Sequence, residues 1–165
     1  MKLMLDRLAL EIVEKNIGTD KLYLIGIKSR GVPMAERFAE YYRRIFKVEV
    51  PVGIIDISLY RDDLSKVAEN PVHNGTNLNF DITGKNIILT DDVLYSGKTV
   101  QTALNVLKKL GEPDKIMLCV LIDRGHKTLP IFAEFTGKTV DTASDEVIKV
   151  AFAETDGSDF VKIME

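Results

Sequence analysis

The sequence predicts an α/β protein in which a mostly parallel sheet is flanked by helices. Four apolar runs of strand length alternate with three segments whose apolar residues recur at helical spacing. This alternation is typical of parallel sheets, because each connection between parallel strands needs a crossover that a helix usually provides. A chain of 165 residues, with 45% hydrophobic and 28% charged residues, has the size and composition of one domain with one sizeable core. We therefore expect residues 1–165 to form a single domain.

Three segments are predicted to be helical. In segment 3–16 apolar residues follow helical spacing and charged residues interrupt them, so we expect an amphipathic helix and not a signal peptide. Segment 33–45 begins with Pro33, which suits the first turn of a helix. Segment 98–110 is followed by Gly111, a residue favoured where helices end.

The predicted strands are the apolar runs that these helices separate. They are Leu22 to Ile27, Val48 to Leu59, Asn86 to Asp92 and Lys115 to Ile122. After Phe132 the chain offers short strand-like pieces, at Val147 to Phe152 and Phe160 to Ile163, and no helix. The stretch from Asn70 to Asp81 is polar and rich in turn residues, which indicates a mobile excursion able to act as a lid.

Cysteine use and hydropathy indicate the cellular setting. The single cysteine, Cys119, lies in the apolar run 116–122, where we expect a small buried hydrophobe and not a nucleophile. No apolar run approaches the length of a transmembrane helix. We therefore expect a cytoplasmic protein without disulfides. Its net charge of -3 means that any nucleic-acid surface must be a local basic patch.

The most informative segment is residues 87–99, Ile-Ile-Leu-Thr-Asp-Asp-Val-Leu-Tyr-Ser-Gly-Lys-Thr. An apolar strand ends at Asp91 and Asp92, and a short turn at residues 94–99, the phosphate loop, opens into a helix. Free backbone N–H groups at such a turn, together with the positive end of the helix dipole, bind phosphate. Carboxylates at the carboxyl end of a strand lie where open α/β sheets bind ligands, and vicinal ribose hydroxyls with a nearby magnesium ion give them a partner. The segment therefore predicts a site for a sugar phosphate.

Two alternative interpretations compete with this one. A nucleoside-triphosphate P-loop shares the tail Gly97-Lys98-Thr99 but requires glycine where this chain has Asp92. An ordinary strand–turn–helix connection with two solvated acids does not explain why a carboxylate pair and a glycine turn follow the same strand. A second loop, the basic loop Lys28-Ser29-Arg30-Gly31, follows the first strand and is expected at the same edge of the sheet. Because polar loops thus follow two strands at the same edge, we interpret the basic loop as a diphosphate-binding loop and not as a solvated Lys/Arg pair.

Segment 87–99 resembles the phosphoribosyl-pyrophosphate (PRPP) motif of type I phosphoribosyltransferases. Three further segments resemble the PyrR branch of that family, whose members regulate pyrimidine operons and act as uracil phosphoribosyltransferases. They are Gly26 to Pro33, Asp56 to Ser65 and Val120 to His126, and with the PRPP motif they span nearly the whole chain. The resemblance implies a type I phosphoribosyltransferase fold, with a central sheet, a small hood and a flexible lid loop.

The chemistry of PRPP then suggests a role for each group. Its transfer passes through an oxocarbenium-like transition state, which needs fixed charges more than a protein nucleophile. The residues expected to be catalytic are Asp91, Asp92 and Arg61. The resemblance places Arg61 on the lid. Magnesium is expected to bridge diphosphate and ribose oxygens, and to reach protein carboxylates through water. The residues expected to bind PRPP are Lys28, Ser29, Arg30, Gly31, Asp91, Asp92, Val93, Leu94, Tyr95, Ser96, Gly97, Lys98 and Thr99.

Base recognition is expected where the fourth strand ends. By resemblance, Ile122, Asp123 and Arg124 frame uracil, so that the products are UMP and pyrophosphate. Nothing in the composition selects uracil over hypoxanthine or guanine, and a purine-salvage phosphoribosyltransferase stays open as an alternative. His126 is interpreted either as a general base or as a structural histidine.

The resemblance also implies an RNA-binding attenuator that recognises pyrimidine-operon leader mRNA and responds to uridine nucleotides. Candidate RNA contacts are Arg7, Lys127 and Lys138. Members of the branch usually carry polar or basic residues where this chain has Asp6 and Leu10, a basic residue where it has Phe132, and often lysine where it has Ser144 and Val147. These departures remove potential phosphate contacts. A nucleotide-sensing regulator without significant catalysis is therefore a further alternative. As in relatives, a homodimer or higher homo-oligomer is expected.

Overall fold

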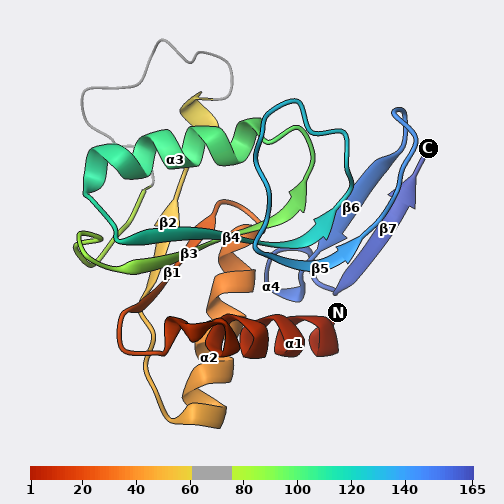
Figure 1. The fold of residues 1–165 in the computed structure, drawn as a ribbon. Helices are drawn as coiled ribbons and strands as arrows, with labels where there is room; N and C mark the ends of the chain where they lie inside the picture. Colours follow the sequence, from red (N-terminus) through yellow and green to blue (C-terminus); the bar gives the residue numbers. More distant parts are fainter. Residues whose placement is uncertain (61–75) are drawn as a thin grey trace.

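The computed structural model describes residues 1–60 and 76–165. Its main sheet has five parallel strands in the order β2-β1-β3-β4-β5, and β6 pairs with β7 in a separate antiparallel sheet (Figure 1). The elements are α1 Lys2–Ile12, a π-helix Val13–Ile17, β1 Leu22–Ile27, α2 Gly31–Phe46, β2 Val52–Ile55, a 3₁₀ turn Ser58–Tyr60, β3 Asn86–Leu94, α3 Lys98–Leu110, β4 Lys115–Asp123, β5 Phe135–Thr139, β6 Val147–Ala151, α4 Ala153–Asp156 and β7 Phe160–Met164. The predicted parallel sheet with flanking helices is confirmed.

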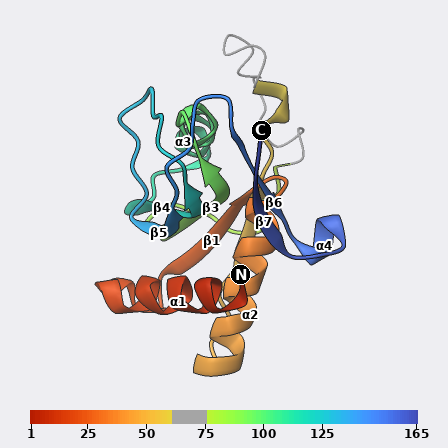
Figure 2. The ribbon, with the colours of Figure 1, turned by 90° about the vertical axis from the view of Figure 1, so that its right-hand side faces the viewer.

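Helices cover both faces of the main sheet. In Figure 1 α3 lies on one face and α1 and α2 lie on the other, and Figure 2 shows α1 crossing α2 below the sheet. Leu8 of α1 and Phe38 of α2 are buried in one hydrophobic cluster, whereas Val100 and Leu107 of α3 are buried in a second. Because both faces are covered, the central strands are nearly continuous apolar runs, which is why the sequence identified them.

The strand order determines which edge of the sheet can bind a ligand. The chain leaves β1 through α2 to reach β2 on one side, and it leaves β3 through α3 to reach β4 on the other. The connections diverge between β1 and β3, and a crevice opens at the carboxyl ends of strands at such a switch point. Gly26 pairs with Thr90 in the register of these strands, so the segments that follow them emerge side by side.

Residues 147–164, the C-terminal hairpin, form a small unit beside the main sheet (Figure 2). Val147 pairs with Met164 at one end of the hairpin, and α4 joins its two strands at the other. Ile148 and Phe152 belong to the same hydrophobic cluster as α1 and α2. Burial of these side chains fixes the hairpin against the α2 side of the sheet.

Several predicted strands and helices differ from the structure. The second strand, predicted over Val48 to Leu59, is limited to β2, because residues 48–51 precede the strand as irregular chain and a 3₁₀ turn at Ser58–Tyr60 follows it. The first helix turns into a π-helix after Ile12, and α4 is a short helix in a region where none was predicted. β5 was not predicted, because only Phe135 among its residues is buried and the strand therefore has no apolar pattern. Pairing with β4 holds it in the sheet.

Cys119 lies in β4 and is completely buried, as predicted. Desolvation raises the pKa of its thiol well above the ordinary value, which opposes nucleophilic reactivity. Among the helices of residues 1–60 and 76–165, none has the length and apolar character needed to cross a membrane.

Candidate active site

A cavity of about 320 Å³ lies at the carboxyl ends of β1, β2 and β3. Its lining is Lys28, Ser29, Arg30, Asp56, Ile57, Ser58, Asp91 and Asp92. The structure therefore brings the basic loop together with the predicted carboxylate pair, across the crevice between β1 and β3. Residues 56–58 were not predicted to be in the site, although their position directly after a strand is the signal that identified the other groups.

The basic loop is held by the strands on both sides. The Lys28 N–H donates to the carbonyl oxygen of Ile55 at 2.9 Å, and Thr90 Oγ1 donates to the carbonyl oxygen of Gly31 at 2.7 Å. The peptide bond between Lys28 and Ser29 is cis. A Cβ atom on Gly31 would lie 2.2 Å from the carbonyl oxygen of Thr90, so only glycine allows the loop to approach β3 this closely.

The charged side chains of the basic loop have carboxylate partners. Lys28 Nζ lies 3.2 Å from Asp56 Oδ2, and Arg30 donates two hydrogen bonds to Asp156 at 3.0 and 3.3 Å. Asp56 also accepts hydrogen bonds from the N–H and hydroxyl of Ser58, at 2.9 and 2.6 Å. Partial burial opposes ionisation of Asp56, but the bonds from Ser58 and Lys28 outweigh it and hold its pKa below the ordinary value.

Asp91 and Asp92 lie near the end of β3, which runs on to Leu94, two residues beyond its predicted end. Asp91 is 7% exposed, and one of its oxygens accepts the N–H of Asp92 at 2.9 Å. An oxygen of Asp92 accepts the N–H of Val93 at 2.9 Å. Both residues line the cavity, where carboxylate oxygens can accept hydrogen bonds from ligand hydroxyls.

The phosphate loop connects β3 to α3. Gly97, with φ of 89°, precedes the first residue of α3, Lys98. The carbonyl oxygen of Ser96 accepts the N–H groups of Thr128 and Leu129 at 3.1 and 3.3 Å, so the loop is packed against the segment after β4. The N–H groups in the first turn of a helix have no partner within the helix, and the start of α3 is therefore suited to phosphate. The loop does not line the 320 Å³ cavity but lies farther along the same strand end.

The predicted base segment lies next to the phosphate loop, because Leu94 pairs with Asp123. The guanidinium of Arg124 lies 4.3 Å from the ring centroid of Tyr95. It donates to Thr142 Oγ1 at 3.1 Å and to the carbonyl oxygens of Ala143 and Glu146 at 3.3 and 2.7 Å, and the residue is 6% exposed. Arg124 thus connects the base segment to the start of the C-terminal hairpin, while its role in binding a base stays a prediction.

Two other polar residues after β4 also make structural contacts. His126 Nε2 lies 2.7 Å from the carbonyl oxygen of Thr142, a contact in which this nitrogen is the donor and which fits the structural alternative for the histidine. Lys127, one of the predicted RNA contacts, forms an ion pair with Asp123 at 2.7 Å.

The remaining predicted residues lie outside this region. Arg61, the lid and the first half of the stretch from Asn70 to Asp81 fall outside the described residues. Arg7 of α1 donates to the carbonyl oxygen of Gly137 in β5, and Lys138 is the next residue of that strand. These two predicted RNA contacts therefore lie close together, where α1 meets β5.

The oxygen donors of the cavity fit magnesium held together with a substrate. Within the described part of the chain, no group of three or more His, Cys, Asp or Glu side chains could hold a metal ion. Mg²⁺ usually keeps several waters and binds through one or two carboxylates and the phosphates of a substrate. Asp91 and Asp92 supply two such carboxylates at the cavity.

Comparison with known proteins identifies the family. Residues 1–154 match the phosphoribosyl transferase domain. The chain belongs to this family. Proteins named "Bifunctional protein PyrR" from Thermus aquaticus and Deinococcus radiodurans are 50% identical to it over 165 and 161 residues, which cover 100% and 98% of this chain and 91% and 88% of theirs. The recognition of the PyrR branch from the sequence is confirmed.

Solved phosphoribosyltransferases share the fold. A hypoxanthine-guanine phosphoribosyltransferase from Bacillus anthracis has a TM-score of 0.68 and 22% identity, covering 96% of this chain and 89% of its own. A hypoxanthine phosphoribosyltransferase from Trypanosoma cruzi has a TM-score of 0.74 and 15% identity, covering 99% and 89%. At such identities the likeness shows the fold alone, and it confirms the type I phosphoribosyltransferase fold. Together with its family, this makes the chain a phosphoribosyltransferase.

Proposed function

We propose that this phosphoribosyltransferase transfers the phosphoribosyl group of PRPP to uracil, forming UMP and pyrophosphate. The observation that carries the proposal is the cavity between β1 and β3, where the basic loop faces Asp91 and Asp92. A ligand that carries both a diphosphate and vicinal hydroxyls matches these two groups. The identity of 50% with proteins named PyrR supports uracil as the base.

The reaction then depends on positioning and fixed charge. Lys28 and Arg30 stabilise the departing diphosphate, while Asp91 and Asp92 hold the ribose hydroxyls so that the anomeric carbon faces the base. Backbone N–H groups and the hydroxyl of Ser96 hold the 5'-phosphate. When bound, Mg²⁺ supplies positive charge to the diphosphate oxygens. No step requires a protein nucleophile.

A panel of bases tests this proposal. Purified protein with magnesium and PRPP is offered uracil, hypoxanthine, guanine or orotate, and pyrophosphate release and the nucleotide product are followed. UMP from uracil alone is the expected result. A purine nucleotide as the main product would support the purine-salvage alternative, and no nucleotide from any base would favour a nucleotide sensor without catalysis.

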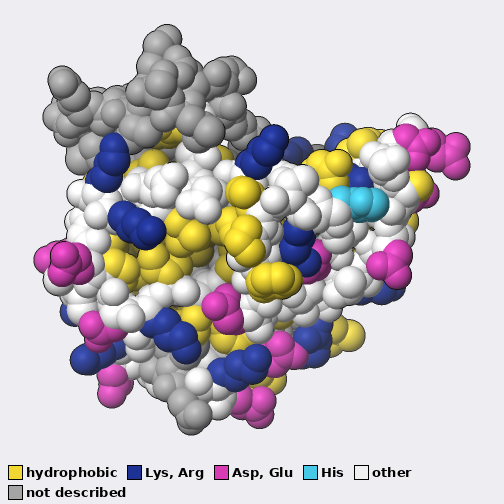
Figure 3. Space-filling view, turned by 45° about the horizontal axis from the view of Figure 1, so that its top comes forward, with side chains coloured by type: hydrophobic (Ala, Val, Ile, Leu, Met, Phe, Trp, Pro, Cys, Tyr) yellow, Lys and Arg dark blue, Asp and Glu magenta, His cyan; other side chains and the backbone are white. Residues whose placement is uncertain are grey.

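We also propose that the protein binds pyrimidine-operon leader RNA in response to uridine nucleotides. The identity with proteins named bifunctional supports this second role. Figure 3 shows that Lys and Arg on the side of α3 are interspersed with acidic and hydrophobic side chains. Arg7, which also forms an ion pair with Glu11, and Lys138 lie close together where α1 meets β5 and are the candidates for a local basic surface.

The RNA proposal is tested by filter binding to a leader hairpin and to unrelated RNA over a range of salt concentrations. Lys138→Glu is expected to weaken binding to both RNAs and to reduce the salt slope by about one unit. Lys109→Glu, a charge change on α3, is the matched control. Equal affinity of the wild type for both RNAs would contradict an attenuator. A homo-oligomer and a cytoplasmic location stay predictions, which light scattering and cell fractionation can check.

A further inference from the structure

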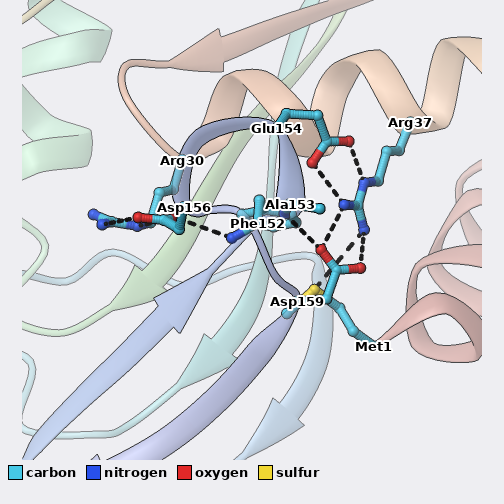
Figure 4. A network of polar contacts seen from close by, with 8 residues as sticks. All are labelled: Met1, Arg30, Arg37, Phe152, Ala153, Glu154, Asp156 and Asp159. Carbon is cyan, nitrogen blue, oxygen red and sulfur yellow. Dashed lines mark hydrogen bonds and ion pairs between the residues drawn. The ribbon is translucent and has the colours of Figure 1, made fainter.

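The C-terminal hairpin reaches the basic loop from the other end of the chain (Figure 4). Arg30 donates from Nε and Nη2 to the two carboxylate oxygens of Asp156, at 3.3 and 3.0 Å. The Asp156 carboxylate also accepts the N–H of Phe152 at 3.0 Å. Asp156 is therefore fixed by the turn of the hairpin and holds one edge of the Arg30 guanidinium.

A separate contact holds the hairpin on α2. Arg37, two helical turns after Arg30, donates pairs of hydrogen bonds to Glu154 and Asp159 at 2.6 to 2.7 Å (Figure 4). Its guanidinium also lies 5.0 Å from the ring centroid of Phe152, which is completely buried. These contacts hold the hairpin on α2 in addition to the pair between Arg30 and Asp156.

We propose that Asp156 is a positioning residue for diphosphate recognition, which holds the Nε edge of Arg30 so that the other edge faces the cavity. A guanidinium carries five N–H donors in a rigid plane, and Asp156 engages only the Nε and Nη2 edge. Arg30 lines the cavity together with Asp91 and Asp92. An arginine that is already held in place loses little side-chain freedom when the diphosphate binds.

This inference rests on the proposed function, because it concerns the leaving group of the same reaction. Asp156→Asn keeps the shape of the side chain and removes the charge that holds Arg30. We expect the Kd for pyrophosphate and the KM for PRPP to rise about threefold to tenfold. The Arg30 side chain would then have to be immobilised when the diphosphate binds, and immobilising one side chain costs a free energy that corresponds to a change of this size. The Kd for UMP, which has no diphosphate, and the KM for uracil are expected to stay unchanged. Calorimetry with magnesium and steady-state kinetics measure these quantities.

The matched control is Asp159→Asn, which weakens the contact of Arg37 with the same hairpin and does not touch Arg30. It is expected to leave pyrophosphate affinity unchanged. Asp156→Glu, which can retain the ion pair, is a second variant and is expected to lose less affinity than Asp156→Asn. In an Arg30→Met background, which leaves no cation for Asp156 to hold, Asp156→Asn is expected to have no further effect on pyrophosphate affinity.

Several results would overturn the inference. Equal weakening by Asp159→Asn, or equal loss of UMP and pyrophosphate affinity in Asp156→Asn, would mean that Asp156 only docks the hairpin. Tighter pyrophosphate binding in Asp156→Asn would mean that the carboxylate competes with the ligand. The test is separate from that of the proposed function, because pyrophosphate binding does not require turnover. A wild type that binds pyrophosphate without transferring it leaves the Asp156 test readable, and one that binds neither PRPP nor pyrophosphate overturns both.

Discussion

Gly31 is the point at which the basic loop touches the centre of the sheet, and Gly31→Ala tests whether this contact aims the loop. The added Cβ would lie 2.2 Å from the carbonyl oxygen of Thr90 and 3.0 Å from its carbonyl carbon. Both are backbone atoms of the central strand β3, so they cannot turn away as the end of a side chain could. The loop would have to retreat by about 1 Å to restore ordinary contact. That movement would also stretch the 2.7 Å hydrogen bond from Thr90 to Gly31.

The size of the effect follows from that displacement. Misplacing a positioning group by about 1 Å can cost on the order of 100-fold in rate, and we expect kcat/KM for PRPP to fall by about this factor. Overpacking is expected to lower the free energy of unfolding by about 1–3 kcal/mol. UMP affinity should stay close to that of the wild type, because the phosphate loop is not displaced. Pyrophosphate release at varied PRPP, urea unfolding and UMP calorimetry measure the three quantities.

Ile87→Val is the control, because Ile87 is buried near the beginning of β3, at the other end of the strand from the site. It is expected to cost about 0.5–1.5 kcal/mol of stability and to leave the kinetics unchanged. Wild-type kinetics in Gly31→Ala would refute the reasoning, since the loop would then act without its close approach to β3. An equal loss of activity in the control would mean that activity follows stability.

Three further predictions concern other parts of the site. Asp91→Ala combined with Asp92→Ala is expected to lower turnover by about 100-fold or more while the protein still folds, and steady-state kinetics and circular dichroism can check both points. Near-normal turnover would mean that these two residues are ordinary acids at the end of a strand. Arg124→Met removes the hydrogen bonds that a buried guanidinium donates to partly buried acceptors, so we expect a loss of about 1–3 kcal/mol in urea unfolding and a higher KM for uracil, whereas unchanged stability would contradict the structural role. The hydrogen bonds from Arg37 lower the pKa of Asp159, so the stability they contribute is fully present above the pKa of an unfolded aspartate, about 4, and is lost as pH falls through the lower folded value. Unfolding midpoints between neutral and acidic pH should show this loss in the wild type and a smaller one in Arg37→Met, and equal slopes would refute it.

The sequence predicted those parts of the site whose residues lie close together along the chain. Segment 87–99 combines a buried strand, two carboxylates, a glycine turn and an amphipathic helix within a few residues, and each of these leaves its own pattern. Asp156 could not be predicted in this way, because the arginine it holds is 126 residues away. The three structural hydrogen-bond acceptors of Arg124 likewise belong to a segment beyond β5, so the local sequence suggested only a base-binding role.

By itself, the sequence determined that apolar strands alternate with amphipathic helices and that charged loops follow the strands, because burial on one or both faces imposes a local periodicity. Only the tertiary structure decided that β1 lies between β2 and β3, which brings the basic loop to Asp91 and Asp92 and leaves the phosphate loop farther along the same edge. It also decided that Arg30, Arg37 and Arg124 have partners in or beside the C-terminal hairpin. Strand neighbours and ion pairs between distant segments depend on which surfaces pack together, and no local pattern of residues encodes that choice.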